Sequence, residues 1–297
     1  MHGPITAPSL AWPARALAAA LLGCTALAGQ VVAANALFER LPAEVRKSGV
    51  LRFVGDSHPP YRIVSDDRKI RDGVQADFAR VLEPLLGVRI EHFVVNSLSA
   101  TMAGLEAGRY DVAMGPGVAT VERQKRFDGV SYMITRPSFV YPTSRTASYL
   151  RVEDLCGRRV AYVAGSVTER VTDRVIAHCA KAGLPPARHV PLVDTNMTMI
   201  ATQAGRADVA GMTLTAALHA VHEGQGRFKF FADAGHTLGI DVLSLFVTKR
   251  SALAPVMRDA FAVLFDNGEY ARIMAKWGIE AVRVDAPRIN QAKWEAL

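Results

Sequence analysis

The sequence predicts an α/β fold in which two lobes face each other across a cleft. Two segments recur in the same order along the chain: 106–114 (EAGRYDVAM) returns as 203–210 (QAGRADVA), and the strand-like 50–55 returns as 159–165. Apolar strand-like runs alternate with helical patterns between these landmarks, which is typical of βαβ units and a mostly parallel sheet. The two repeats have different offsets, as expected if two related lobes carry different loops.

Individual elements support this fold class. Apolar residues spaced i, i+3 and i+4 predict a helix over 74–86, and the apolar run at 88–95 predicts a strand. Near the end of the chain, 252–265 and 269–277 predict two helices separated by Asn267-Gly268.

Composition excludes several classes of protein. The chain has 297 residues, of which 50% are hydrophobic and 21% charged, so wholesale disorder and a collagen-like fibre are excluded. The net charge of +7 raises nucleic acid as a partner. The basic residues do not cluster, however, since the densest group is only Arg123, Lys125 and Arg126. We therefore expect a solvated basic surface and no nucleic-acid partner.

The N-terminus predicts export. An uncharged stretch runs from Ala16 to Phe38 after Arg15, and its first part has the length of a signal-peptide core. The signal peptide would comprise residues 1–28, or 1–36 with the second small-residue cleavage site. Two alternatives remain: lipidation of Cys24, which follows Leu-Leu-Gly, and an uncleaved membrane anchor. The expected location is the periplasm.

Export determines how the cysteines are interpreted. The mature chain keeps Cys156 and Cys179, an even pair that lies 23 residues apart. In an oxidising compartment such a pair predicts a disulfide rather than a metal site or a nucleophile.

Two predicted strands end in glycine turns that lead into helices. Ligands of α/β folds bind at such strand ends, where helix N-termini present free N–H groups. Ser166 has capping-box spacing to Glu169, a pattern that a simple capped helix also explains. Arg123 lies in a predicted first helical turn, where its charge opposes the helix dipole. It therefore needs a compensating anion, and a ligand carboxylate can supply one.

Several segments resemble one known family: 55–61 (GDSHPPY), 73–77 (GVQAD), 105–114 with 120–123 (TVER), 154–166 with 179–183, and 270–278 (YARIMAKWG). Over about 41–290 the chain resembles the extracytoplasmic solute-binding proteins of family 3, the polar amino-acid type, which feed ABC importers. The resemblance implies a type II periplasmic-binding fold that closes at a hinge. Lobe 1 would comprise 41–141 and 239–297, and lobe 2 would comprise 142–238.

The resemblance also implies a function. The partners would be a small-molecule ligand, an amino acid or related organic anion, and a cognate ABC permease in the inner membrane. The protein would be a monomer without cofactor or metal. The segments 154–166 and 179–183 resemble a subset of the family that bears a disulfide in lobe 2.

Carried over residue by residue, the resemblance implies a ligand site. Arg123 would hold the ligand carboxylate. The lining from lobe 1 would be Gly115, Pro116, Gly117 and Val118, and the lining from lobe 2 would be Ser166, Val167 and Thr168. Asp56 lies in the loop after the first strand, and His58 and Leu98 stand where the family places aromatic side chains over the ligand. Thr213 stands where the family has the acid that pairs with an amino-acid ammonium.

An enzyme is the alternative class. Some proteins of this fold are periplasmic cyclohexadienyl dehydratases acting on prephenate or arogenate, a chemistry that needs a positioned acid in the cleft. The candidate loops supply no acid beyond Asp56. His219, His222 and Glu223 lie at a predicted helix end and are interpreted as solvated rather than metal-binding. We therefore expect a binding protein without catalytic residues.

Overall fold

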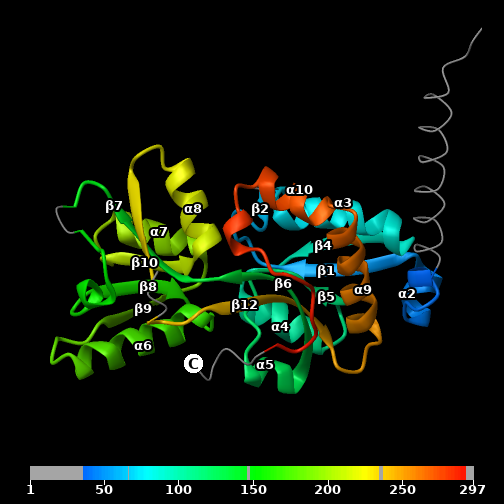
Figure 1. Cartoon of the computed structure of the whole chain (residues 1–297), viewed down its shortest axis with the longest axis horizontal. Coiled ribbons are helices and arrows are strands. Elements are labelled where there is room, and N and C mark those ends of the chain that lie inside the picture. Colours follow the sequence, from blue (N-terminus) through cyan, green and yellow to red (C-terminus); the bar gives the residue numbers. More distant parts are fainter. Residues whose placement is uncertain (1–35, 66, 146–147, 234–236, 292–297) are drawn as a thin grey trace, which may run out of the picture.

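A computed structural model describes residues 36–291, except 66, 146–147 and 234–236. It consists of two lobes, each built on a five-stranded sheet covered by helices (Figure 1). The expected signal peptide and the lipidation site at Cys24 lie outside the described residues. In the part of the chain that the structure describes, no helix is both long and apolar enough to cross a membrane.

The sheet of lobe 1 is mixed. From edge to edge its strands are β4 (Arg89–Val94), β1 (Val50–Gly55), β5 (Val112–Ala113), β12 (Asp241–Thr248) and β6 (Phe127–Thr135). Strand β1 is parallel to β4 and β5, whereas β12 is antiparallel to β5 and β6. Smaller elements of this lobe are α2 (Ala43–Ser48), η2 (Glu280–Val282) and a separate hairpin of β2 (Ile63–Val64) and β3 (Ile70–Asp72).

Helices cover both faces of this sheet because its strands bury side chains on both sides. Leu51 and Phe53 of β1 join a large core with the helices α3 (Val74–Leu86), α9 (Leu253–Asp266) and α10 (Glu269–Lys276). Val54 points into a smaller cluster with Leu105 of α4 (Leu98–Glu106). These helices and β4 confirm the predictions for 74–86, 88–95, 252–265 and 269–277.

The sheet of lobe 2 repeats this plan. Its strand order is β11 (Phe228–Ala232), β7 (Pro137–Pro142), β10 (Val209–Thr213), β8 (Arg159–Val163) and β9 (Arg188–Leu192). The accompanying helices are η1 (Val152–Leu155), α6 (Val167–Lys181), α7 (Thr195–Gln203) and α8 (Leu214–Glu223). Strands β10, β8 and β9 are parallel, and β7 is antiparallel to both of its neighbours.

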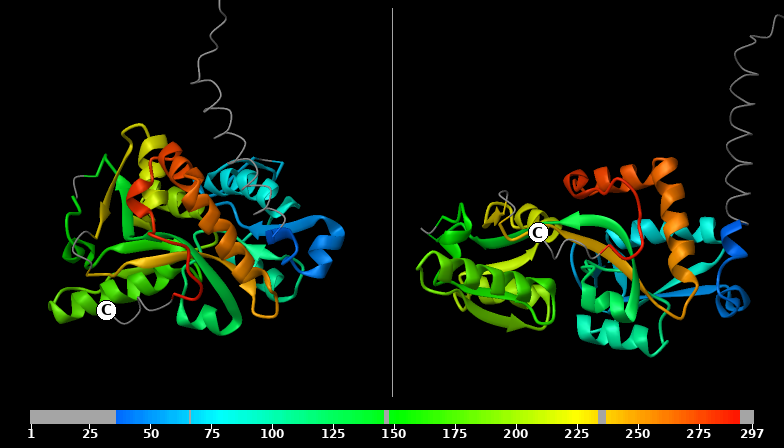
Figure 2. Two further views of the ribbon diagram at one scale, coloured as in Figure 1. Left: turned by 45° about the vertical axis from the view of Figure 1, so that its right-hand side comes forward. Right: turned by 60° about the horizontal axis from the view of Figure 1, so that its bottom comes forward.

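The chain crosses between the lobes twice, first at Arg136 between β6 and β7, and again between β11 and β12 (Figure 2, right). The expected end of the first segment of lobe 1 at residue 141 is therefore too late. Strand β7 belongs to lobe 2 because it pairs with β10 and β11.

The internal repeat has a structural counterpart in each lobe. In lobe 1, Asp111 accepts hydrogen bonds from the backbone N–H of Arg52 (2.8 Å), from its Nε (3.0 Å) and from its Nη2 (2.7 Å). In lobe 2, Asp208 accepts the same three bonds from Arg159 at 2.8, 3.1 and 2.9 Å. The two recurring segments thus bind each other in each lobe, which explains why they recur in the same order.

The predicted disulfide is confirmed. Cys156 follows η1, and Cys179 lies in the last turn of α6, with their Cα atoms 5.6 Å apart. The bond belongs to the core that α6 forms with β8. It therefore fixes the end of α6 that lies farthest from the helix N-terminus.

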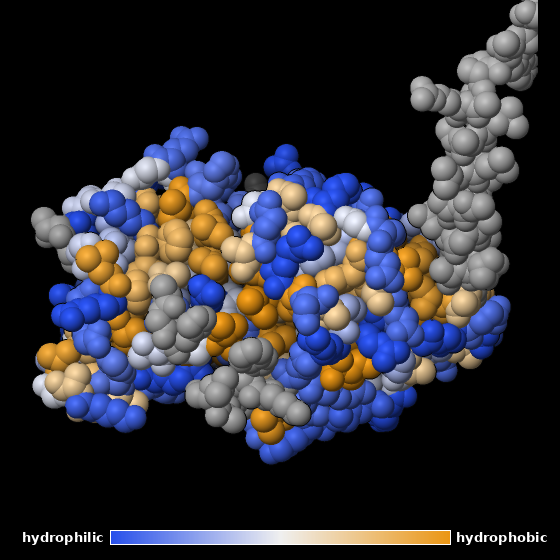
Figure 3. All heavy atoms as spheres, viewed as in Figure 1, coloured by the Kyte–Doolittle hydropathy of each residue, from blue (hydrophilic) through white to orange (hydrophobic). Residues whose placement is uncertain are grey.

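Hydrophilic side chains are spread over both lobes on the face shown in Figure 3, with apolar patches between them. Many basic groups on the described surface are paired, as Arg126 is with Glu106 and Lys249 with Asp128. This distribution agrees with the solvated basic surface expected from the sequence.

Candidate ligand-binding cleft

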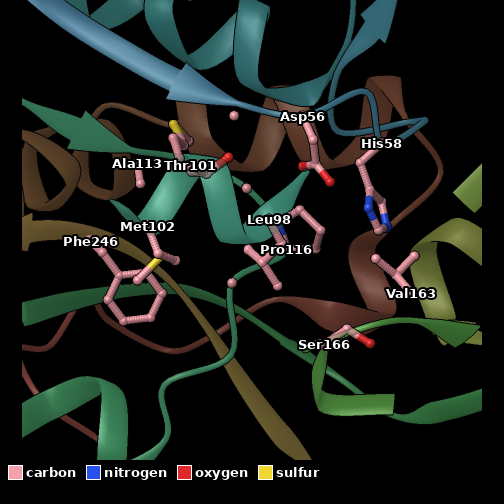
Figure 4. A pocket seen from close by; sticks show the side chains of 14 residues that line it. Asp56, His58, Leu98, Thr101, Met102, Ala113, Pro116, Val163, Ser166 and Phe246 are labelled. Carbon is pink, nitrogen blue, oxygen red and sulfur yellow. The ribbon is translucent and has the colours of Figure 1, made fainter. Parts of the chain in front are cut away.

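A cleft lies between the two lobes where several strands end. It consists of two adjoining cavities that share His58, Leu98, Pro116, Val163 and Ser166 as lining. In Figure 4, Asp56 and His58 descend from the loop after β1, while Val163 and Ser166 approach from the opposite side. The structure therefore places the cleft at the carboxyl ends of parallel strands, as expected for an α/β fold.

The structure brings together all the predicted site residues except Val118. The cleft is lined from lobe 1 by Asp56, His58, Leu98, Gly115, Pro116, Gly117 and Arg123, and from lobe 2 by Ser166, Val167, Thr168 and Thr213. Val118 is 3% exposed and does not line either cavity. It contributes instead through its carbonyl oxygen, which accepts a hydrogen bond from Arg123.

Arg123 is fixed by the start of α5 (Val121–Arg126), as predicted. The side chain of Thr120 caps this helix by accepting a hydrogen bond from the backbone N–H of Arg123 at 3.1 Å. The guanidinium donates from Nη1 to Val118 O at 2.9 Å and from Nη2 to Gly165 O of lobe 2 at 3.3 Å. It forms no ion pair with any described carboxylate.

The electrostatics of Arg123 follow from this position. Burial, assisted by the charge of Arg170 and opposed by that of Asp241, lowers its pKa to about 10. A buried cation whose protein partners are carbonyl oxygens is poorly compensated. An anion in the cleft would stabilise the guanidinium in place of the water that burial removes.

The lobe 2 wall includes the N-termini of α6 and α8. Ser166 Oγ caps α6 by accepting from Thr168 N at 3.2 Å, and Glu169 accepts from Gly165 N at 2.9 Å. Thr213 Oγ1 caps α8 by accepting from Ala216 N at 3.3 Å. Both helices direct the positive end of their dipole toward the cleft.

On the lobe 1 side, His58 contributes a neutral ring. Burial lowers its pKa, and the charges of Asp56 and Arg62 act on it in opposite directions. The ring Nδ1 lies 3.2 Å from Thr195 Oγ1, whereas Nε2 is buried and has no hydrogen-bond partner among the described residues. His58 thus presents an unused polar atom next to the cleft.

Sequence reasoning missed Arg62, which lies beneath the cleft. Its side chain is 2% exposed, and it donates to Asp56 O at 2.9 Å and to Met114 O at 2.7 Å. A Cβ on Gly55 would lie 1.7 Å from Arg62 Nη1, so only glycine fits at the end of β1. Burial lowers the pKa of Arg62 to about 10, and the charge of Asp56 opposes this shift. The glycine at the strand end was the one sequence signal for such a close approach.

Other lining residues were also missed. They are mainly apolar and come from α4, from the end of β5 and from β12: Met102, Ala113, Met114 and Phe246. They carry no chemical pattern that separates them from ordinary core residues, so only the fold identifies them.

Side chains that line or adjoin the cleft bond from one lobe to the other. Besides the bonds of Arg123 to Gly165 and of His58 to Thr195, Tyr61 donates from its hydroxyl to Thr213 Oγ1 at 3.3 Å. These contacts define a closed arrangement of the lobes.

The His219, His222 and Glu223 group lies outside this cleft, in a groove between α8 and the end of α10. Burial lowers the pKa of His219. Among the described residues, no cluster of histidine, cysteine and acidic side chains could hold a metal ion.

Two α/β lobes, two crossings between them and a ligand-sized cleft at the strand ends define a type II periplasmic solute-binding protein, the class that supplies ABC importers. The family model of bacterial extracellular solute-binding proteins, family 3, matches residues 51–280. The chain therefore belongs to that family, and the resemblance found in the sequence is confirmed.

Relatives agree with this assignment. The arginine-binding protein ArgT of Corynebacterium glutamicum is 27% identical over 255 residues, which cover 84% of this chain and 81% of the relative. The amino acid ABC transporter substrate-binding protein AbpA of Streptococcus pneumoniae, bound to L-arginine, has a TM-score of 0.68 at 19% identity, covering 80% of this chain and 97% of that one. The ancestral amino acid-binding protein AncCDT-1, a precursor of cyclohexadienyl dehydratase, has a TM-score of 0.66 at 21% identity, covering 79% and 97%.

Proposed function

We propose that the cleft binds a small solute through its carboxylate and that Arg123 holds this group. The observation that supports the proposal is the guanidinium itself, which is desolvated, bonded only to carbonyl oxygens and without an ion pair to a described acid. A carboxylate can accept two parallel hydrogen bonds from a guanidinium, which makes this pairing strong and directional. The bond to Gly165 lies on the opposite lobe, so ligand binding and lobe closure would be coupled through the same side chain.

The bound solute would be delivered to a cognate ABC permease in the inner membrane. The family and the names of the relatives support this role, and we propose that the protein acts as a monomer. Thermal unfolding across a panel of amino acids, organic acids and betaines tests the binding function. A ligand at about 100 times its Kd adds about 2.7 kcal/mol of stability, which a melting curve resolves. A panel in which no carboxylate raises the melting temperature would contradict the proposal.

We also propose that residues 1–28, or 1–36, are an export signal. N-terminal sequencing of protein from the periplasm should find a start near Gly29 or Leu37, or a lipidated Cys24. An intact Met1 on cytosolic protein would contradict export.

A dehydratase-like enzyme is the second candidate, because the relative AncCDT-1 is named as the precursor of one. Elimination needs a positioned acid, and Asp56 is the one carboxylate among the described residues that line the cleft. We propose binding without turnover. Incubation with prephenate or arogenate should give no product, whereas a rate that disappears in Asp56→Asn would establish the enzyme.

A further inference from the structure

The charged groups at the cleft leave one positive charge uncompensated. Among the described lining residues only Arg123 and Asp56 carry a formal charge. Arg62 donates to the backbone carbonyl oxygen of Asp56 at 2.9 Å, so the two opposite charges attract each other, although Arg62 forms no ion pair with a described carboxylate. Arg170 and Asp241, which both act on Arg123, have opposite signs and offset each other. A ligand with a net charge of −1 would offset the charge of Arg123.

The hydrogen bonds that Thr213 makes within the protein determine whether its hydroxyl can donate to a ligand or accept from one. A threonine hydroxyl has two acceptor lone pairs and one hydrogen. Thr213 Oγ1 accepts from Ala216 N and from the Tyr61 hydroxyl, both at 3.3 Å, so both of its lone pairs are engaged inside the protein. Its hydrogen remains for the cleft. Thr213 therefore meets a ligand as a donor.

Other features of lobe 2 add positive potential to this cavity. Ser166 Oγ already accepts from Thr168 N, and the N-termini of α6 and α8 both add positive potential. Of the described residues that line the cavity containing Arg123 and Thr213, none is acidic. An ammonium buried in this cavity would have no carboxylate of its lining as a partner, and a buried cation without a counter-charge is costly.

The other end of the cleft is apolar. Leu98, Met102, Phe246 and Val163 line the cavity that extends from Pro116 into lobe 1 (Figure 4). A hydrocarbon chain attached to the polar group would be buried there and would contribute through the hydrophobic effect.

We propose that the ligand is a 2-oxo or 2-hydroxy carboxylate with an apolar chain, not the corresponding 2-amino acid. This inference rests on the proposed function, because it requires the carboxylate to lie at Arg123. The oxygen on the second carbon accepts the hydrogen bond of Thr213, which lines the same cavity as Arg123. The chain occupies the cavity beside Met102 and Phe246.

Calorimetry with matched probes tests the proposal. One series is 4-methyl-2-oxopentanoate, 2-hydroxy-4-methylpentanoate and leucine, and the other is phenylpyruvate, phenyllactate and phenylalanine. Within at least one series the oxo or hydroxy acid should bind at least about 100-fold more tightly than the amino acid, since mismatched buried polar groups discriminate strongly. The same titrations are repeated with Arg123→Ala.

Two variants at one position isolate the charge. Asparagine and aspartate are both good N-caps, so Thr213→Asn and Thr213→Asp should each keep α8 capped, which circular dichroism and the melting temperature check. The aspartate adds a negative charge beside the ligand oxygen. The Asp variant should bind the oxo or hydroxy acid at least about 100-fold more weakly than the Asn variant does.

The outcomes separate this inference from the proposed function. If the amino acids bind, bind more tightly to the Asp variant than to the Asn variant and lose affinity in Arg123→Ala, the inference is overturned while the carboxylate site stands. If no probe binds, the inference is overturned, and the panel of carboxylates decides the proposed function. If binding is undiminished in Arg123→Ala, both are overturned. Oxo or hydroxy acid binding that requires Arg123 and is lost in the Asp variant supports both.

Discussion

Replacement of Arg123 by alanine tests the centre of the proposed site. In the closed structure its guanidinium spans the cleft between Val118 O at 2.9 Å and Gly165 O at 3.3 Å. Without it, a bound carboxylate stays buried with no charged partner, at a cost of roughly 2–5 kcal/mol. That cost corresponds to a rise in Kd of about 30- to 5,000-fold. Arg123→Lys should also fail, because an ammonium cannot reproduce the planar, bidentate geometry.

Stability should respond in the opposite way from binding. Burial lowers the pKa of Arg123 to about 10, which shows that the fold desolvates this cation without compensating it. Its removal should therefore leave the melting temperature of the ligand-free protein unchanged or higher. The added ligand should raise that temperature in the wild type by roughly 5–10 °C at about 100 times Kd, and should not raise it in the variant.

Calorimetry and thermal unfolding measure both quantities, with Arg126→Ala as the matched control. Arg126 ends the same helix but forms an exposed ion pair with Glu106, so its loss should cost about 0–1 kcal/mol of stability and leave ligand affinity intact. An Arg123→Ala protein that binds as tightly as the wild type would refute the reasoning. An Arg126→Ala protein that loses binding equally would show that the helix rather than the guanidinium matters.

Three further predictions concern the stability of the fold. Replacing Cys156 and Cys179 by serine opens a loop with a sequence separation of 23 residues, which should lower the free energy of unfolding by about 3 kcal/mol. The melting temperature should fall while ligand affinity changes little. A loss of affinity without a change in melting temperature would contradict this prediction. Burial, assisted by the charge of Arg62, lowers the pKa of His92 to about 4, whereas the unfolded chain takes up this proton near pH 6.5. The free energy of unfolding should therefore fall as the pH drops from 6.5 to about 4, and urea titrations should show a shallower fall for His92→Gln. An equal pH dependence in the variant and the wild type would contradict this prediction. Asp208→Asn should cost about 2 kcal/mol and more than Asp111→Asn, because Arg145 donates to Asp208 at 3.0 Å in addition to Arg159; equal costs in denaturant titrations would show that this extra bond contributes nothing.

Local sequence patterns predicted several features of the fold and of the site. The recurrence of 106–114 as 203–210 predicted two related lobes, since each copy encodes the same helix, turn and strand. The capped start of α5 marked Arg123, because a cation in a first helical turn is unfavourable without an anion. Two cysteines in a chain with a predicted export signal predicted the disulfide.

Only the tertiary structure decided how the two sides of the cleft meet. The boundary at Arg136 depends on which sheet β7 joins, and strand pairing between distant segments leaves no trace in local periodicity. Arg62 is charged, and its residue type predicts a surface position. In the structure its guanidinium packs closely against Gly55, and the side chain is buried beneath the cleft. The hydroxyl of Tyr61 reaches Thr213 across 152 residues of sequence. Residue type alone leaves the donor or acceptor role of a hydroxyl open, because that role is set by the partners that the closed lobes bring within hydrogen-bonding distance.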